Sequence, residues 1–332
     1  MEEKKEGRKC KKKNLGLVNY EELPNYMKDN EYILHYYRVE WPLKEAFLSV
    51  FSWHNETLNV WTHFGGFFLF LGLTIMHLVE MPGVLELLSR IFWPLLLTSS
   101  KASYKFGNST MTTALLQMPG PLVPVSGTQA NRWPLFVFLG GSMFCLLTSS
   151  LCHLLCCHSQ RLNHFLWRLD YGGISIMIVA SFFPPIYYIF QCEPLFQVLY
   201  LSAISVMGIL VVVTLLSPEL SSPAFRKLRA MLFLAMGFSG IIPAVHALVV
   251  NWNEPLRFIT LAYELAMAFF YGTGTFFYVS RVPEKWKPGS FDMAGHSHQI
   301  FHVFVVAGAI AHYDAAMIFL KWRDTVGCNQ FQ

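Results

Sequence analysis

Charged side chains are scarce in this chain of 332 residues. Asp, Glu, Lys and Arg together make up 14% of it, whereas 54% of its residues are hydrophobic. The mean hydropathy of +0.39 lies outside the range of an ordinary water-soluble domain. This composition indicates that most of the chain lies in lipid.

Cysteines are also few for a chain of this length, and their positions do not suggest a disulfide framework. Most of the seven fall on or just beyond one apolar run, in apolar or reducing surroundings. We expect them to be small buried hydrophobic residues. S-acylation is the alternative for Cys156 and Cys157, which are predicted to lie at the membrane edge. The four cysteines of this run are Cys145, Cys152, Cys156 and Cys157.

Several familiar sequence signals are absent. The first 14 residues carry too many charges for a signal peptide. The chain lacks the Asp-Arg-Tyr and Asn-Pro-x-x-Tyr motifs of G-protein-coupled receptors, and it has no internal repeat. Its basic tail lacks a folded recognition element, so no nucleic-acid partner is expected.

Long apolar runs are what the sequence does have. Seven runs are long enough to span a bilayer, which requires about 20 residues of helix. Their lengths and the lack of strict alternation favour helices over barrel strands. The last two runs each contain one carboxylate, Glu264 and Asp314. The seven predicted spans are Val60–Val79, Trp133–Cys157, Tyr171–Cys192, Pro194–Pro218, Ala230–Val250, Phe258–Ser280 and His298–Leu320.

Basic residues predict how the seven spans are oriented. If the N-terminus is cytosolic, eighteen Lys and Arg residues lie on the cytosolic side and seven on the other. We therefore expect an all-α integral membrane protein, a seven-helix bundle with a cytosolic N-terminus and an outside or lumenal C-terminus. The sequence does not distinguish the plasma membrane from an endomembrane.

The predicted spans divide the chain into three parts. Residues 1–58 form a basic cytosolic tail followed by a pre-membrane segment, in which Leu43–Phe51 has the pattern of a short amphipathic helix. Residues 59–320 form the membrane domain, with a long outer loop at 80–132. Residues 321–332 form a short outer or lumenal tail.

Five groups that could serve a metal site fall at one depth near the predicted cytosolic face. His298 and His302 are four residues apart, so a helix places both rings on one face. His153 and Asp170 flank another cytosolic boundary, and His63 lies one turn into the first span. Three neutral imidazoles with an open position suit a catalytic zinc ion, and a nearby carboxylate can hold its water. The sequence therefore predicts a zinc site in this layer.

Other polar residues in the spans are expected to have structural roles. A single membrane histidine usually packs or bonds to a neighbouring helix, which is our interpretation of His77, His246 and His312. Glu264 and Asp314 are interpreted as polar groups near the helix ends, with a role in ligand passage as the alternative. We expect His296 to face solvent from a loop.

Three motifs resemble those of the progestin and adipoQ receptor family, most closely its plant adiponectin-receptor-like heptahelical branch. The resemblance covers about residues 20–328. It is carried by Asn55-Glu56-Thr57-Leu58-Asn59-Val60-Trp61-Thr62-His63, by Ser149-Ser150-Leu151-Cys152-His153 with Leu169-Asp170-Tyr171-Gly172-Gly173-Ile174, and by Ser297-His298-Gln299-Ile300-Phe301-His302-Val303.

The resemblance implies a function for the predicted site. It implies that His153, His298 and His302 bind zinc and that Asp170 contacts it through water. It also implies that Glu56, Asn59 and His63 belong to the motif, and that the chain is a receptor like the related adiponectin receptors, which have ceramidase activity. Animal relatives usually have Gly at the position of Leu58, and the long loop 80–132 is a second departure. Ligand recognition on the outer face therefore does not carry over from them.

Two functions remain open from the sequence. In the first, the chain hydrolyses a lipid amide such as ceramide in hormone or stress signalling, with Asp170 accepting a proton and Ser149 bonding the oxyanion. In the second, zinc is structural and the chain is a non-catalytic receptor or scaffold. Expected partners are a ceramide-like lipid or fatty acid, and cytosolic proteins that bind the N-terminal tail.

Overall fold

The described part of the chain is helical. The computed structural model describes residues 15–81, 83–84, 130–217, 220 and 223–328, so most of the predicted loop 80–132 and the tail 1–14 lie outside it. Within these residues the only β-pairing is one isolated bridge, between Val18 and Tyr37. The α-helices are α1 (Leu43–Leu48), α2 (Thr57–Val79), α4 (Trp133–Leu155), α5 (Gln160–Ile189), α6 (Pro194–Leu215), α7 (Arg226–Phe238), α8 (Ile241–Val250), α9 (Arg257–Ser280) and α10 (Ser297–Val326).

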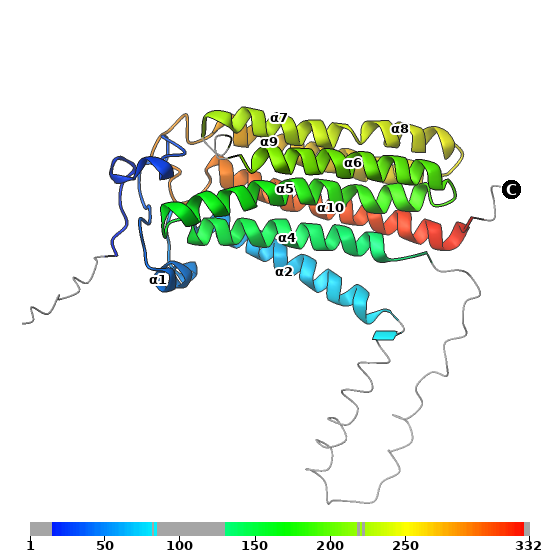
Figure 1. Ribbon diagram of the computed structural model, residues 1–332, viewed down its shortest axis with the longest axis horizontal. Helices are drawn as coiled ribbons and strands as arrows, with labels where there is room; N and C mark the ends of the chain where they lie inside the picture. Colours follow the sequence, from blue (N-terminus) through cyan, green and yellow to red (C-terminus); the bar gives the residue numbers. More distant parts are fainter. Residues whose placement is uncertain (1–14, 82, 85–129, 218–219, 221–222, 329–332) are drawn as a thin grey trace, which may run out of the picture.

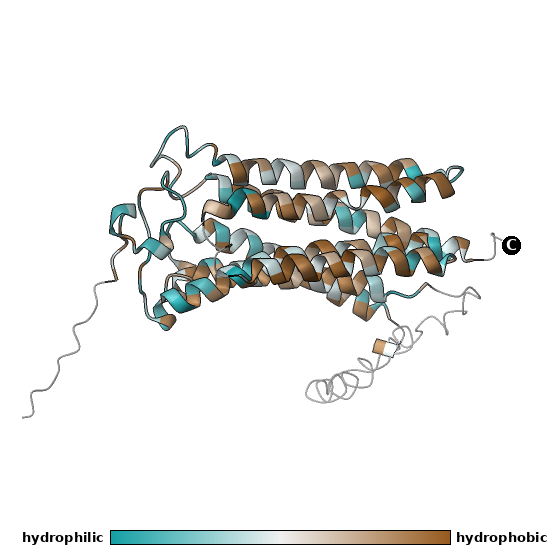
Figure 2. Cartoon of the chain, turned by 45° about the horizontal axis from the view of Figure 1, so that its top comes forward, coloured by the Kyte–Doolittle hydropathy of each residue, from teal (hydrophilic) through white to brown (hydrophobic). Residues whose placement is uncertain are grey.

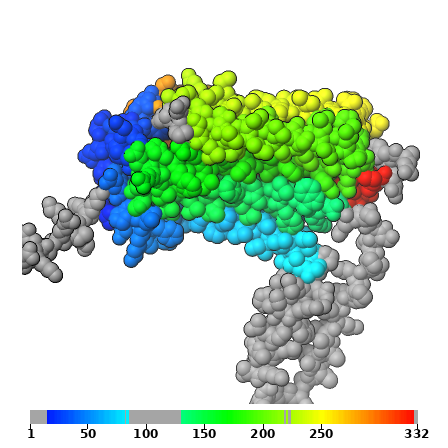
Figure 3. Space-filling view, viewed as in Figure 1, coloured from blue at the N-terminus to red at the C-terminus, as the bar shows by residue number. Residues whose placement is uncertain are grey.

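The long helices lie side by side in one bundle (Figure 1). Helix α4 packs between α2 and α5, and α9 runs along α10. The segment that precedes α2 covers one end of the bundle, which we call the inner end, and α10 finishes at the opposite, outer end (Figures 1 and 3). Strongly apolar residues predominate along the middle of the helices (Figure 2), as expected for helices in lipid.

The membrane prediction is confirmed. Among the described residues, six segments are long and apolar enough to cross a bilayer, and α7 with α8 counts as one of them. Helix α9 does not reach this level of hydropathy, since it carries several hydroxyl groups and Glu264, yet its 24 residues lie beside α10 in the bundle. With α9, each of the seven predicted runs corresponds to a helix or a pair of helices.

Three helices differ from the predicted runs. Helix α5 begins at Gln160, eleven residues before the predicted span, because its first turns continue beyond the apolar run. Helix α10 continues past Leu320 to Val326. The fifth run is divided at Ser239 and Gly240, where α7 ends and α8 begins. Gly240 packs against the ring of Phe182, which leaves little space for a side chain there.

Small residues let the central helices approach closely. A Cβ atom at Gly141 in α4 would lie 2.4 Å from the Cβ of Ala180 in α5. Small residues at such crossings are typical of membrane helices, whose association depends on packing rather than on the hydrophobic effect. The resulting core contains Phe70, Phe138 and Leu146, all of which are buried.

The pre-membrane segment is bound to the bundle by polar contacts. Asp29 forms an ion pair with Arg226 at the start of α7, at 2.6 Å, and Glu31 forms one with Arg281 after α9. Phe47 in α1 and Phe51 in the 3-10 turn that follows it are exposed, beside the inner end of the bundle. Cys156 and Cys157 are buried, which favours packing over S-acylation.

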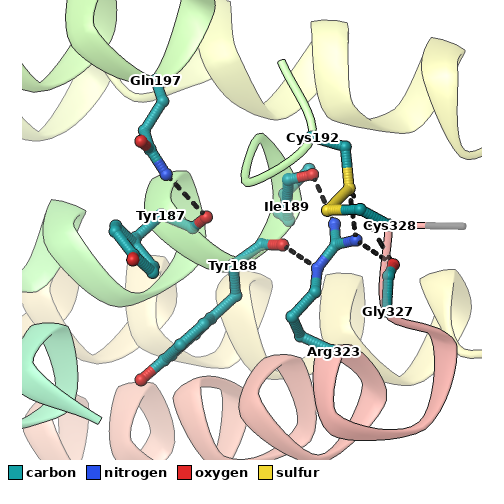
Figure 4. The surroundings of a disulfide bond; sticks show 8 residues. All are labelled: Tyr187, Tyr188, Ile189, Cys192, Gln197, Arg323, Gly327 and Cys328. Carbon is teal, nitrogen blue, oxygen red and sulfur yellow. Dashed lines mark hydrogen bonds between the residues drawn. A yellow bond between two sulfur atoms is a disulfide. The ribbon is translucent and has the colours of Figure 1, made fainter. Parts of the chain in front are cut away.

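The outer end contains a disulfide that the sequence did not predict. Cys192 follows α5 and Cys328 follows α10, and the bond joins them across 136 residues (Figure 4). Beside it, the buried guanidinium of Arg323 donates to the carbonyl oxygens of Tyr188 and Ile189, at 2.6 and 2.8 Å. These carbonyls belong to the last turn of α5, so Arg323 caps that helix from α10.

We expect this disulfide to contribute to stability. Replacing Cys328 with Ser should lower the free energy of unfolding by about 2–4 kcal/mol, since the bond restricts the unfolded chain. Thermal melting of the purified protein, with and without reductant, measures this effect. Reductant should lower the melting temperature of the wild type but leave the Cys328→Ser protein unchanged. An equal loss in both proteins would contradict the assignment.

Candidate metal centre

Three histidines from two helices converge at the inner end of the bundle. His298 and His302 lie one turn apart on the same face of α10, and His153 lies in the last turn of α4. The candidate ligand atoms of the three rings all lie within 4.8 Å of one another. His153 and His302 are almost completely buried. The structure therefore brings together the three residues that the sequence predicted as ligands.

The hydrogen bonds of these rings indicate which nitrogen is available to a metal. Nδ1 of His153 lies 2.8 Å from a carboxylate oxygen of Glu56, and Nδ1 of His302 lies 3.2 Å from the carbonyl oxygen of Asn59. Both partners only accept hydrogen bonds, so each Nδ1 carries the proton and each Nε2 presents a lone pair. This arrangement is typical of metal-binding histidines.

The Nε2 atoms then face one another. Nε2 of His298 lies 3.2 Å from Nε2 of His153. At this distance a proton carried by His298 or a cation has to lie between the two nitrogens, since two lone pairs would repel each other. Three imidazoles around one point match the ligand set of a catalytic zinc ion, so the residues fit this metal.

Glu56 and Asn59 form the support of His153. The amide nitrogen of Asn59 donates to the Glu56 carboxylate at 2.5 Å. Burial alone would raise the pKa of Glu56, but the contact with His153 holds its pKa well below the usual range. Glu56 is therefore ionised at neutral pH and can accept a hydrogen bond from the Nδ1–H group of His153.

Asp170 and Ser149 lie beside the three imidazoles. The Ser149 hydroxyl is hydrogen-bonded to the buried Asp170 carboxylate. Both residues line a cavity of about 30 Å³ that also contacts His298 and His302. The structure thus places the predicted proton acceptor next to the predicted ligands.

His63 belongs to the same layer but not to the group of ligand atoms. Its ring stacks on His302 with centroids 3.5 Å apart and an angle of 10° between the rings. Its nitrogens make no hydrogen bond within the described residues. The depth of His63 was predicted correctly, and the structure gives it a packing role against His302.

A second and larger cavity of about 90 Å³ approaches the histidines from the pre-membrane segment. Asp29, Arg226 and Glu56 contribute charged groups to its wall. His298 lines both cavities, so the candidate centre lies between a polar cavity at the inner end and a more apolar one among the helices.

Sequence reasoning missed the role of Arg38. Its buried guanidinium donates to the carbonyl oxygens of His153 and Leu154, both at 2.8 Å, and to the Ser49 hydroxyl. Arg38 therefore caps the end of α4 at the residue that carries a candidate ligand. No sequence pattern signals this contact, because Arg38 is one of many basic residues before the first span.

The start of α10 is also more closely packed than expected. The Glu284 carboxylate accepts the backbone N–H of Ser297 at 2.7 Å and also the Ser297 hydroxyl, which satisfies the first turn of the helix. His296, which was expected to face solvent, is buried, and that prediction is wrong. The reason is that the pre-membrane segment and the Asn55 carbonyl cover it.

The ligand assignment can be tested by metal analysis. We expect one zinc ion per purified chain and its loss in His302→Ala, since two imidazoles bind far more weakly than three. His63→Ala is the matched control, because it removes the stacked ring and leaves the three ligands. Elemental analysis of both proteins measures the difference. Full zinc content in His302→Ala would overturn the assignment.

Arg38 should affect metal binding without touching the metal. Arg38→Gln should weaken zinc affinity by about 10–100-fold, the usual cost of losing support for a ligand. Competition with a chelator measures the affinity of the folded protein, and Arg281→Gln serves as a control at the same end of the bundle. A lower melting temperature with unchanged zinc affinity would contradict this role.

Comparisons with known proteins agree with the fold. Residues 51–313 match the haemolysin-III-related family. The chain is 54% identical to heptahelical transmembrane protein ADIPOR1 of Oryza sativa subsp. japonica, over 96% of this chain and 88% of the relative. It is 55% identical to heptahelical transmembrane protein 1 of Arabidopsis thaliana, over 94% and 83%.

A more distant relative comes from an animal. The adiponectin receptor protein of Drosophila melanogaster is 33% identical over 90% of this chain and 58% of the relative. The family match includes all three candidate ligands, and the plant relatives extend over nearly the whole chain. The chain therefore belongs to the haemolysin-III-related family, as an adiponectin-receptor-like heptahelical membrane protein.

Proposed function

We propose that this receptor-like protein hydrolyses the amide bond of a membrane lipid, with ceramide-like lipids as the substrate class. The observation that carries the proposal is the group of three buried imidazoles with Asp170 beside it. A purely structural site would not need a buried carboxylate next to the ligands, since burial of a carboxylate is costly.

The chain's own residues would hold the reacting groups. His153, His298 and His302 would bind zinc, which supplies positive charge to polarise an amide carbonyl and to make a water more acidic. Glu56 and the Asn59 carbonyl keep Nε2 of two rings directed at the centre. Asp170 would orient the water and accept its proton.

The proposed reaction is the addition of water across one amide bond. The water oxygen forms a bond to the carbonyl carbon, and the carbon–nitrogen bond breaks. The proton that Asp170 accepts passes to the leaving nitrogen, so the products are a fatty acid and an amine. Ser149 is bonded to Asp170 in this structure, and it would have to turn towards the substrate to stabilise the oxyanion.

The two cavities support an amphiphilic substrate. The cavity among the helices is lined by Ile174, Phe233 and Val305, which match an acyl chain in polarity, and the cavity would have to widen to hold one. The cavity beneath the pre-membrane segment is lined by polar and charged groups, which suits the polar end of the lipid and water. Because His298 contacts both, the amide bond of such a lipid would lie at the candidate centre.

The alternative is a receptor or scaffold in which zinc only joins helices. This view is supported by the position of the ligands on α4 and α10, which one ion would tie together. Cytosolic proteins that bind the N-terminal tail would then relay the signal. In this case purified protein holds zinc but releases no fatty acid.

Replacement of Asp170 separates these functions. For the enzyme, Asp170→Asn should reduce the hydrolysis of a fluorescent ceramide by about 100-fold or more, as for loss of a general base, and should keep one zinc per chain. Asp314→Asn, a carboxylate on α10 towards the outer end, is the matched control. Hydrolysis should also stop when a chelator removes zinc from the wild type.

Two results would contradict the enzyme. The first is purified wild-type protein with one zinc per chain and no release of fatty acid from any lipid amide tested. The second is undiminished hydrolysis by Asp170→Asn. Either result would favour the structural role of the metal.

A further inference from the structure

One histidine in the bundle differs from the others outside the candidate metal centre. His77 lies 2.8 Å from the Tyr313 hydroxyl, and His246 lies 3.0 Å from the Tyr200 hydroxyl, so both have side-chain partners as expected. His312 is only 2% exposed. Its ring lies beside the backbone of Ser181 but makes no well-formed hydrogen bond within the described residues.

The nearest acidic group is Glu264 on α9. Its Oε1 atom lies 3.7 Å from Nδ1 of His312, which is beyond a hydrogen bond, and Oε1 has no hydrogen-bond partner in the described residues. Glu264 lies seven residues inside α9, so the expectation of a helix-end group is wrong. No Lys or Arg of the described chain forms an ion pair with it. Burying two such groups unpaired is costly, and polar groups in membrane helices usually have a function.

This pair is separate from the candidate metal centre. His302 and His312 are ten residues apart on one helix, which corresponds to about 15 Å at the usual rise per residue. Neither Glu264 nor His312 lines the two cavities that reach the three histidines. The pair therefore forms a second polar layer, nearer the outer end.

The geometry of the pair suits a hydroxyl group. One oxygen can accept a hydrogen bond from the imidazole N–H and donate one to the carboxylate, with bonds of about 2.8 Å to each. Atoms 3.7 Å apart can be bridged in this way when the two bonds meet at a sharp angle at the shared oxygen. Phe138 packs edge-on against His312, with ring centroids 4.7 Å apart, and gives the site an apolar wall.

Access and charge narrow the class of ligand. The side chain of Glu264 is 28% exposed, so the pair can be reached from outside the packed helices. The medium that surrounds the bundle at this helix is lipid, because α9 lies in the membrane bundle. A fatty acid anion would meet no Lys or Arg of the described residues at this pair, and an ammonium group would first have to lose its water.

We propose that Glu264 and His312 bind the hydroxyl group of an uncharged lipid alcohol. This alcohol would reach the pair from the lipid around the outer half of the membrane domain. The hydroxyl donates a hydrogen bond to the carboxylate and accepts one from the imidazole N–H. This site does not depend on the amidase activity proposed above. Long-chain alcohols and sterols share this chemistry, and the test below distinguishes them.

Binding can be measured on the full chain in phosphatidylcholine nanodiscs. The probes are tritium-labelled 1-hexadecanol, tritium-labelled cholesterol, and hexadecyl methyl ether as an unlabelled competitor that has the chain but no hydroxyl donor. We expect at least one alcohol to bind saturably and the ether to compete at least tenfold more weakly than unlabelled alcohol. The alcohol that binds identifies the class of lipid.

Two variants assign the binding to this pair. Glu264→Gln and His312→Phe should each weaken alcohol binding by at least tenfold, because each removes one hydrogen-bonding partner of the hydroxyl. His246→Phe is the matched control, since it removes a histidine that already has a partner. Unchanged melting temperatures establish that the variants are folded.

Several results would overturn the proposal. They are the absence of saturable binding by both alcohols, equal competition by the ether, and unchanged binding in both variants. The comparison of alcohol and ether uses the wild type alone, so the proposal stays open to disproof even if a variant fails to fold. The zinc content of the Glu264→Gln protein should equal that of the wild type, because the pair is separate from the candidate metal centre.

Discussion

The hydrogen bond between His153 and Glu56 is the contact on which the inner end of the bundle depends. It joins α4 to the residue that precedes α2, and it determines which nitrogen of His153 is free. Arg38 holds the same turn of α4 from the pre-membrane segment. In surroundings of low polarity such bonds are strong, and an unpaired partner is costly. The pre-membrane segment is therefore part of the candidate centre rather than a cover over it.

Helix α10 carries polar groups in two layers with apolar packing between them. The inner layer holds three imidazoles and their supports, with the candidate ligand atoms within 4.8 Å of one another. The outer layer holds His312 opposite Glu264. Between them, Gly308 lets the ring of Tyr271 pack directly against α10, since a Cβ atom there would lie 2.7 Å from it. Tight packing of this kind keeps the two layers apart.

The sequence predicted the features that depend on local pattern. Apolar runs gave the spans, and the depth of His153, His298 and His302 gave the group of ligands. Features that depend on pairing between distant segments were missed. The disulfide joins residues that are 136 positions apart in the sequence. Arg38 donates a hydrogen bond to the carbonyl oxygen of His153, which is 115 positions away. The periodicity of a sequence does not show which basic side chain of a charged segment will be buried in the bundle. It also does not show that two isolated polar residues on neighbouring helices will face each other.

The position of α10 has a consequence for how the protein is made. Helices leave the ribosome in sequence order, and the helices α2 and α4 emerge long before α10. His153 and Glu56 must therefore wait in the membrane for the two remaining ligands, while Cys192 waits for Cys328. Both the group of candidate metal ligands and the disulfide are completed only by α10 and the residues that follow it. A newly made chain that stops short of α10 would carry an unpaired thiol and a single exposed ligand, and these are features by which quality control can recognise it.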